Sequence, residues 1–542
     1  MTSAWPQSYY LFGKGLGFSA FLAVLPTLLL LFLLAVKRKA SWIAALAGLA
    51  ATLALAVGAY GMSWRHTLSA AAYGAAFGLF PITWVIFWAL VLYQITVRTA
   101  QFEVIKDSIG SITADARLQA LLIAFAFGAF LEGCAGFGTP VAVAAAMMVG
   151  LGFAPLYASS LCLLANTAPV AFGSIGIPIV TLAAVTGLAV RPLSADIGMI
   201  CAPVSFFLPA YLILVTCGRA AVRAVWPAVL ACGASFALVQ FSVSRSIGPQ
   251  LTDILSSLAA MASLVVLLRF WQPAEIDTAH INVTTERGMA RRHTTGEVWF
   301  AWMPYALLVV FVLAWGFGPI QALLNKVTYT FAWPGLNNEI MRRPPVVRVT
   351  ALYGAMFSGN WLSASGTACM FASLLSAVLA RMRMKAFAEE CLSVARKLIF
   401  PTITVTAMLA MAFVMNYCGA TGTLGLAFAA TGAAVPFFSS LTGWLGVFLT
   451  GSDTASNALF GNLQVVSASR LGLDPVLMAA ANSAGGVMGK MISLQSIAVA
   501  AAATGMSVPE QARLFRFTLR HSVLLASIVG LEVLMYAYLL RR

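Results

Sequence analysis

The sequence predicts an all-α polytopic membrane protein with about twelve transmembrane helices and two re-entrant hairpins in inverted repeats. Of its 542 residues, 61% are hydrophobic and only 9% are charged, whereas about a quarter of the residues in a soluble protein are charged. Apolar stretches long enough to cross a bilayer run through most of the chain, and similar motifs recur in its two halves. A soluble globular enzyme, a disordered chain and a disulfide scaffold are excluded by the same composition.

Nine apolar stretches are predicted membrane spans, because about 20 apolar residues cross a bilayer as a helix. They are residues 17–36, 42–62, 67–97, 197–216, 225–243, 251–269, 298–318, 398–418 and 521–540.

Three further apolar regions, residues 118–153, 155–190 and 441–503, are interrupted by glycine, proline and hydroxyl residues. Backbone groups freed at membrane depth must be satisfied by protein or water, so such breaks persist where they line a cavity. One isolated Gly or Pro favours a kinked helix without a site, but dense clusters in both halves favour broken helices. We predict hairpins at 118–153 and 441–470, with a further break at 485–490. The glycines expected at these breaks are Gly133, Gly136, Gly138, Gly451 and Gly489.

The two halves of the chain share several short motifs. GAFLEG at residues 128–133 matches GVFLTG at 446–451, and Asn166-Thr167-Ala168 matches Asn482-Ser483-Ala484 at nearly the same offset. Any one match is weak in an apolar sequence, but several in register indicate duplication. Inverted repeats with broken helices are typical of secondary transporters.

The net charge of +15 comes from short basic clusters between apolar stretches. This pattern is typical of cytoplasmic loops beside anionic lipid and not of nucleic-acid binding. Placing Lys37-Arg38-Lys39 inside also places residues 270–297 and Arg513, Arg516 and Arg520 inside, with both termini outside. Arg541-Arg542 would then lie outside, against the same rule. The predicted parts are residues 1–216 as first repeat, 217–297 as linker helices and cytoplasmic loop, and 298–542 as second, inverted repeat.

Few ionisable groups fall inside the apolar segments, and four of them are considered as candidates: Glu132, Asp453, Lys490 and Glu532. A charge at the bilayer centre costs roughly 2.5–3.5 kcal/mol on insertion scales, so each needs a reason. Glu132 and Asp453 occupy matching turns of the two halves and are candidate proton-coupling groups, since burial disfavours the charged form of a carboxyl. The alternative is that each caps the N-terminus of a half-helix.

Lys490 is the candidate partner of a substrate carboxylate, and a permanent ion pair with Asp453 is the alternative. Uncharged polar residues around the breaks suit a small polar anion, although each alone could join helices. The candidate substrate-binding residues are Lys490, Asn166, Thr167, Asn482, Ser483, Gln495 and Ser365. Ser365 belongs to a polar cluster at residues 358–367 that interrupts the apolar run from 349 to 380.

Enzymatic motifs are not found. The sequence contains no HExxH, no GxSxG, no P-loop and no Rossmann glycine pattern. The four histidines are dispersed and the eight cysteines show no metal-ligand spacing. We therefore expect no enzyme activity, no metal and no cofactor.

The segments around the breaks resemble the L-lactate permease family, which includes lactate and glycolate permeases. The resemblance covers nearly the whole chain and departs from the common family pattern at Cys134, where the family usually has alanine, and at 358–361, which is less charged here. The motifs that carry it are GAFLEGCAGFGTP (128–140), VGLGFAPLY (149–157), NTAPVAFGSIGIP (166–178), GWLGVFLTGSDTASNAL (443–459), GGVMGKMISLQS (485–496) and LFRFTLRH (514–521).

The resemblance implies a multi-pass transporter of a bacterial-type inner membrane that moves a small 2-hydroxy monocarboxylate together with H⁺. The expected substrates are L-lactate and glycolate, with D-lactate as a further candidate. Two alternatives stay open: a sodium-coupled carboxylate symporter, and a membrane sensor that binds the same anions without transporting them.

Overall fold

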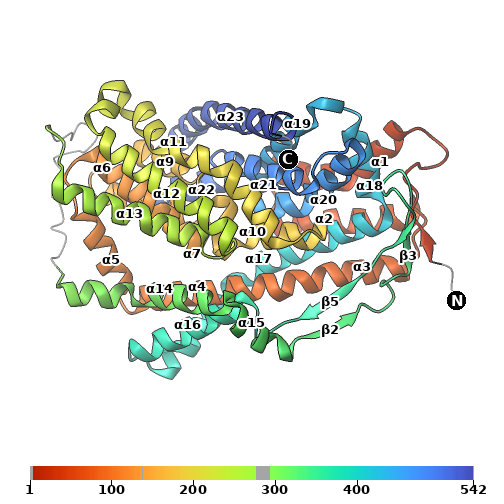
Figure 1. The fold of residues 1–542 in the computed structure, drawn as a ribbon, viewed down its shortest axis with the longest axis horizontal. Helices are drawn as coiled ribbons and strands as arrows, with labels where there is room; N and C mark the ends of the chain where they lie inside the picture. The colour runs from red at the N-terminus through yellow and green to blue at the C-terminus, as the bar shows by residue number, and fades with distance from the viewer. Residues whose placement is uncertain (1–3, 137, 276–292, 541–542) are drawn as a thin grey trace.

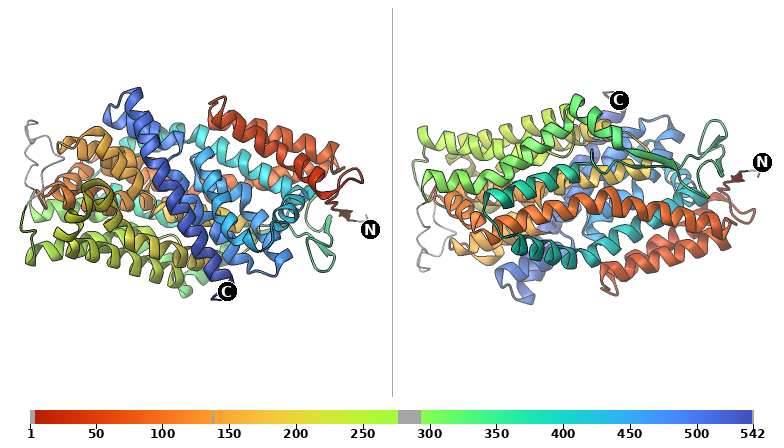
Figure 2. Two further views of the ribbon diagram at one scale, coloured as in Figure 1. Left: turned by 90° about the horizontal axis from the view of Figure 1, so that it is seen from above. Right: turned by 90° about the horizontal axis from the view of Figure 1, so that it is seen from below.

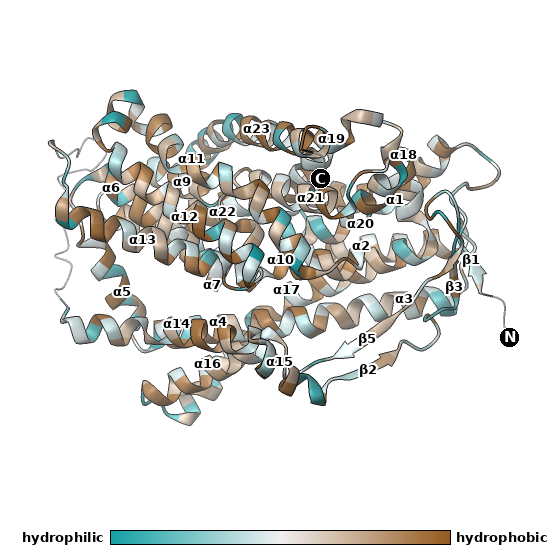
Figure 3. Ribbon diagram, in the orientation of Figure 1, coloured by the Kyte–Doolittle hydropathy of each residue, from teal (hydrophilic) through white to brown (hydrophobic). Residues whose placement is uncertain are grey.

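The computed structural model describes residues 4–136, 138–275 and 293–540 (Figure 1). Most helices run along the long axis of the molecule, and hydrophobic residues occupy most of their length (Figure 3). Within the described residues, 12 helical segments are long and apolar enough to cross a membrane. The prediction of a polytopic all-α membrane protein is confirmed. Arg541-Arg542 and most of the predicted cytoplasmic loop at 270–297 lie outside the described residues.

The N-terminal part is a short strand followed by helices that pack as neighbours. Its elements are β1 (Trp5–Pro6), α1 (Leu16–Ala35), α2 (Ser41–Gly58), α3 (Trp64–Phe77), the π-helical η1 (Gly78–Thr83), α4 (Trp84–Arg98) and α5 (Gln101–Gly110). The side chain of Ser63 caps α3 by accepting a hydrogen bond from the His66 backbone N–H. Phe80 leaves the helical region of backbone space, so the long span Trp64–Arg98 is bent there.

The first hairpin unit comprises residues 116–186. It contains α6 (Ala116–Gln119), η2 (Ala120–Phe127), α7 (Gly128–Cys134), α8 (Thr139–Gly150), α9 (Pro155–Ala165), η3 (Val170–Phe172) and α10 (Gly173–Thr186). The segment Ala116–Cys134 is buried along its whole length. Gly136 (φ 58°) and Gly138 (φ 82°) turn the chain back between α7 and α8, a backbone region that favours glycine. The two helical halves at 155–165 and 170–186 meet at 65°.

The middle of the chain carries long helices, short strands and further helices. The elements are α11 (Val190–Ala224), α12 (Trp226–Ser246), α13 (Thr252–Phe270), α14 (Thr295–Gly316), α15 (Gly318–Leu324), η4 (Asn325–Val327), β2 (Tyr329–Ala332), β3 (Ile340–Arg342), β4 (Ala351–Leu352), β5 (Met356–Gly359), α16 (Ser365–Leu379), α17 (Met384–Cys418), α18 (Ala420–Ala429) and η5 (Gly432–Ala434).

The strands gather at the end of the molecule that holds the N-terminus (Figure 1). β2 and β5 pair antiparallel, while β3 pairs with β1 in parallel and with β4 antiparallel. The apolar run predicted at 349–380 therefore contains two strands before α16 begins. The polar cluster at 358–367 covers the end of β5, a turn and the start of α16, so it is not a break within a membrane helix.

The second hairpin unit comprises residues 435–504. It contains α19 (Val435–Thr450), α20 (Asp453–Leu471), α21 (Pro475–Lys490) and α22 (Leu494–Thr504). The predicted break at 485–490 is misplaced, because α21 continues through these residues and the chain leaves the helix at 491–493. The glycines Gly485 and Gly489 instead let α21 approach α19. An added Cβ would overlap the carbonyl oxygen of Ser440 at Gly485 and that of Trp444 at Gly489.

Each unit packs against the other in a corresponding way. The second half of each broken helix lies against the second helix of the opposite hairpin: α10 packs on α20, and α22 packs on α8. Gly461 of α20 touches Leu182 of α10, where an added Cβ would meet the leucine side chain. This reciprocal packing agrees with a duplication, while the predicted division at 216/217 and 297/298 and the inward and outward orientation stay predictions.

The last helix, α23 (Val508–Tyr538), crosses the other long helices obliquely (Figure 2). It contacts α19 and α21 of the second unit and α9 of the first unit. Ser507 and Glu510 form a capping box at its start. The helix therefore packs against both units from one side.

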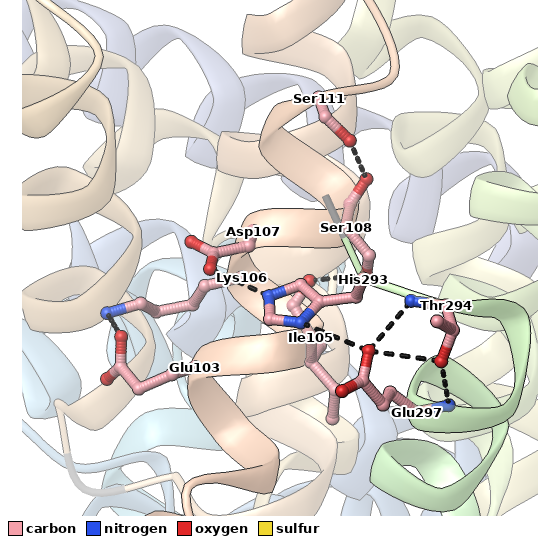
Figure 4. Close-up of polar contacts among 9 residues, drawn as sticks. All are labelled: Glu103, Ile105, Lys106, Asp107, Ser108, Ser111, His293, Thr294 and Glu297. Atoms are coloured by element: carbon pink, nitrogen blue, oxygen red, sulfur yellow. Dashed lines mark hydrogen bonds and ion pairs between the residues drawn. The ribbon is translucent and has the colours of Figure 1, made fainter. Parts of the chain in front are cut away.

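A polar clamp fixes the start of α14 against α5 (Figure 4). His293 Nε2 lies 2.9 Å from Asp107 Oδ2, and Thr294 and Glu297 form a capping box at the start of α14. The imidazole is largely buried between the two acids. This contact fixes the position of α14 relative to α5.

The close approach of α19 and α21 gives a stability prediction. Gly485→Ala places a methyl group against the Ser440 backbone, which cannot yield as a flexible side chain would. We expect it to destabilise the protein by about 1–3 kcal/mol or more, read as a lower melting temperature of the purified protein in detergent. Gly150→Ala is the matched control, because nothing lies within 4 Å of its added Cβ. Equal melting temperatures for the two variants would contradict this packing.

Candidate functional site

A cavity of about 410 Å³ lies where the two hairpin units meet. Its polar wall combines Glu132 of α7, Ser174 of α10, Asp453 at the start of α20, Lys490 at the end of α21, and Gln495 of α22. Residues 400–409 of α17 and the residues at the start of α2 close it on the other side. Three ionisable residues that sequence analysis singled out therefore line one space.

Glu132 lies in the last turn of α7 and is only 5% exposed. Its Oε1 occupies the space beside Gly173, where an added Cβ would lie 2.7 Å away. Its Oε2 makes no hydrogen bond of ordinary geometry among the described residues, although the Asn166 side chain lies near enough to interact with the carboxyl. Glu132 does not cap the N-terminus of its own helix, because it lies at the C-terminal end of α7, and α10, whose first residue is Gly173, has no side-chain cap.

Asp453 is the first residue of α20 and is also buried. The cap of that helix is Ser452, whose Oγ accepts a hydrogen bond of 3.3 Å from the Ala455 N–H. Asp453 Oδ2 instead accepts hydrogen bonds from Ser483 Oγ (2.6 Å) and Asn457 Nδ2 (3.2 Å). Its carboxylate is thus held by side chains of the second unit and is not engaged in capping.

Lys490 is buried at the end of α21, and its Nζ donates a 2.6 Å hydrogen bond to the Gly451 carbonyl oxygen. Gly451 (φ 76°) forms the tip of the second hairpin, so this bond ties the tip to the broken helix. The permanent ion pair with Asp453 is not formed: across the described residues, no carboxylate oxygen lies within the 4.0 Å ion-pair distance of Nζ. The ammonium group still interacts electrostatically with both Glu132 and Asp453.

A hydrogen-bonded chain of side chains stands behind Asp453. Ser439 donates to Gln464 (2.7 Å), Gln464 to Asn482 (3.4 Å), and Asn482 to Asn457 (2.9 Å). Asn457 also donates to the Pro178 carbonyl of α10 (3.2 Å), so the network reaches the first unit. Sequence analysis did not single out Asn457 or Gln464. A signal was present for Asn457, which follows Asp453 by four residues and so shares its helix face.

The corresponding region of the first unit lacks such a network. Both polar atoms of the Asn166 side chain, both carboxyl oxygens of Asp253 and the Oε1 of Gln240 have no partner among the described residues. Gln240 Nε2 donates to the Ala168 carbonyl (3.1 Å), and Thr167 Oγ1 donates to the Leu164 carbonyl (2.7 Å). The unpartnered groups in this region are therefore mostly acceptors. Asp253 and Gln240 were not singled out because each looks like a single polar residue in a predicted span.

The structure brings together only part of the predicted substrate-binding set. Lys490 and Gln495 line the cavity, whereas Asn166, Thr167, Asn482 and Ser483 lie behind its wall. Ser365 lies at the start of α16, which packs on α4 and α14 away from the cavity. Among the predicted glycines, Gly136, Gly138 and Gly451 form turns with positive φ. Gly133 and Gly489 lie inside helices, where they permit close packing.

Metal binding finds no support within the described ranges, since no group of three His, Cys, Asp or Glu residues there is arranged to hold an ion. The cavity instead offers one ammonium group, two carboxyls, a primary amide and several hydroxyls. This set suits a small polar anion and proton exchange.

Comparison with known proteins gives the family. The family model for L-lactate permease matches residues 19–540. The L-lactate permease of Salmonella typhimurium is 43% identical over 99% of this chain and 98% of its own length. The L-lactate permease of Bacillus subtilis (42%, 97% of each chain) and the glycolate permease GlcA of Escherichia coli (42%, 98% of each chain) are also similar.

Two solved transporters are similar in structure. The Alcanivorax borkumensis YdaH transporter has a TM-score of 0.42 at 13% identity, covering 83% of this chain and 84% of that one. Neisseria gonorrhoeae MtrF has a TM-score of 0.46 at 12% identity, covering 87% of this chain and 83% of that one.

The family match and the 12 membrane-spanning helices identify a multi-pass membrane protein, of the inner membrane in bacteria. Its relatives are permeases, which are transporters and not enzymes. The chain belongs to the L-lactate permease family.

Proposed function

We propose that this protein is a proton-coupled symporter of small 2-hydroxy monocarboxylates, with L-lactate and glycolate as substrates and D-lactate as a further candidate. Relatives named L-lactate permease and glycolate permease support this substrate class. The observation that carries the proposal is the shared cavity, in which a buried lysine without a carboxylate partner lies among two buried carboxyls. A space of about 410 Å³ accommodates such a small anion together with water.

Lys490 is assigned to the substrate carboxylate. Its single hydrogen bond to the Gly451 carbonyl leaves two of the three ammonium donors for a ligand. Gln495, on the same wall and next to Gly451, is assigned to the substrate hydroxyl or carboxylate. Asn482 and Ser483 are not assigned a contact with the substrate. They donate hydrogen bonds to Asn457 and Asp453 and so hold these side chains in place. Asn166 and Thr167 remain candidates for contacts at the first break.

Glu132 is assigned to the coupled proton, and Asp453 either balances the charge of Lys490 or forms a second proton site. Moving a proton and an anion together keeps the loaded carrier near neutral. This lowers the cost of carrying charge across the membrane potential, which is about 2.3 kcal/mol per charge and 100 mV. A carrier of the anion alone would gain nothing from a buried, unpartnered carboxyl at this position.

Gradient-driven uptake tests the coupling. In sodium-free proteoliposomes with the interior one pH unit more alkaline, wild-type protein should accumulate labelled L-lactate roughly tenfold, the limit for 1:1 electroneutral symport. Glu132→Gln should abolish this accumulation but retain exchange of internal for external lactate, because the amide mimics the protonated carboxyl. Protein-free liposomes control for passive entry of lactic acid, and a protonophore should collapse the wild-type signal.

Three results would contradict this assignment. Glu132→Gln accumulation with unchanged pH dependence would exclude Glu132 as the proton carrier. Wild-type uptake that requires sodium instead of a proton gradient would favour a sodium-coupled symporter. Saturable lactate binding without any uptake would favour a sensor.

Removing the cation tests the substrate site. Lys490→Gln should raise the KM for L-lactate by roughly tenfold to a hundredfold, since a hydrogen bond to a charged group contributes about 1.5–3 kcal/mol. Lys397→Gln is the matched control, because Lys397 is an exposed lysine of α17 that does not line the cavity. The measurement is the concentration dependence of initial uptake rates. An unchanged KM in Lys490→Gln would place the substrate elsewhere.

A further inference from the structure

Asp253 is a buried acid that the assignments above do not use. It lies in the first turn of α13 and is only 1% exposed. Neither of its carboxyl oxygens has a hydrogen-bond partner within the described part of the chain. An ionised carboxylate in such a place carries a large desolvation cost, so the group binds a proton unless a charge compensates it. This burial requires an explanation.

Helix capping does not explain Asp253. The cap position of α13 is Leu251, and no side chain accepts a hydrogen bond from the first turn. Asp253 gains only the attraction of the helix dipole, which contributes about 0.3–1 kcal/mol at exposed sites and up to about 2 kcal/mol where partly buried. That is too little to hold a fully buried charge.

Asp253 lies directly against the turn that carries Glu132. The helices α13 and α7 pack together, and a Cβ added to Gly133 would lie 2.8 Å from Asp253 Cβ. Gly133, the residue after Glu132, lies where the two helices are in contact, and Asp253 leaves no room there for a larger side chain. Asp253 also interacts electrostatically with Glu132. Two buried carboxyls thus lie on adjoining helices.

No cation compensates Asp253 from its own surroundings. The segments packed against α13 are α7, η2, α12 and α10, and the electrostatic neighbours of Asp253 also include Cys201 of α11. Arg245 and Arg269 form no ion pair with Asp253 among the described residues. The ionisable side chains on α13 and these four segments are Glu132, Cys134, Cys232, Arg245 and Arg269.

We infer that Asp253 and Glu132 form one proton-binding unit, in which Asp253 is a second proton-carrying residue of the transport cycle. This inference rests on the proposed proton-coupled transport. Two buried carboxyls that interact electrostatically ionise together only at a large cost, so the pair keeps one proton. In the empty carrier the pair holds one proton, and Lys490 balances its single negative charge. Uptake of a second proton neutralises the pair and leaves the Lys490 charge for the substrate carboxylate.

The charges of this cycle balance at each stage. Asp453 keeps one protonation state throughout the cycle, so its charge does not change between the stages. In the empty state the pair carries −1 and Lys490 carries +1. In the loaded state the pair is neutral, Lys490 carries +1 and the substrate carries −1. One proton and one anion therefore enter together, and neither is bound stably without the other.

Asp253→Asn tests the inference, because the amide matches the protonated carboxyl in shape and cannot release a proton. In proteoliposomes with an alkaline interior of one pH unit, we expect Asp253→Asn to keep lactate accumulation, because Glu132 still takes up and releases one proton. The pH at which initial uptake is half-maximal should shift by roughly one unit or more, because a second carboxyl no longer shares the proton with Glu132. Glu103→Gln, which removes an exposed carboxylate of α5, and Asp253→Glu, which keeps a carboxyl at position 253, should both retain the wild-type pH dependence.

The outcomes separate this inference from the proposed function. Wild-type protein that shows no proton-driven accumulation would overturn the proposed function itself. An Asp253→Asn protein with the same pH dependence of uptake as the wild type, beside an uncoupled Glu132→Gln, would overturn only the role of Asp253. An Asp253→Asn protein that fails to fold, judged by size-exclusion chromatography, would also contradict it, since the loaded state contains a neutral side chain at this position.

Discussion

The organisation of this protein depends on the cost of holding ionisable groups away from water inside an apolar helical bundle. Glu132, Asp453 and Lys490 are all buried, yet they form no direct ion pair with one another. Such groups persist only where backbone dipoles, neutral hydrogen bonds or a ligand compensate them. The broken helices provide this environment, because their turns bring the Gly451 carbonyl to Lys490 and place Gly173 beside Glu132.

The two hairpin units compensate their buried ionisable groups in different ways. In the second unit, Ser483 and Asn457 donate hydrogen bonds to Asp453, Asn482 donates to Asn457, and Gln464 donates to Asn482. Asp453 thus keeps one oxygen, Oδ1, without a partner among the described residues. In the first unit, Glu132 Oε2 and both carboxyl oxygens of Asp253 have none. The two halves of the duplicated fold therefore differ in the chemistry of their polar side chains. The connected network is suited to fix geometry, and the carboxyl-rich side is suited to bind and release protons.

Much of the fold was predictable from the sequence. Apolar length located the spans, and clusters of glycine and proline located both hairpins, since these signals are local. Three features were not predictable. Gly485 and Gly489 suggested a break, but they serve helix contact with α19, and only the partner backbone distinguishes these roles. Asp253 resembled an ordinary acid at the start of a helix, because its burial depends on how α7 packs against α13. Ser365 looked like part of the site, but it begins α16, which packs on α4 and α14 away from the cavity.

The central claim is that binding of the anion requires a proton on a buried carboxyl. Proton uptake on binding tests it most directly, with purified protein in weakly buffered detergent solution and a pH indicator. Addition of L-lactate at a pH where the empty carrier holds a deprotonated carboxyl should remove about one proton from solution for each substrate bound. Saturable binding of L-lactate with no proton taken up would contradict the account.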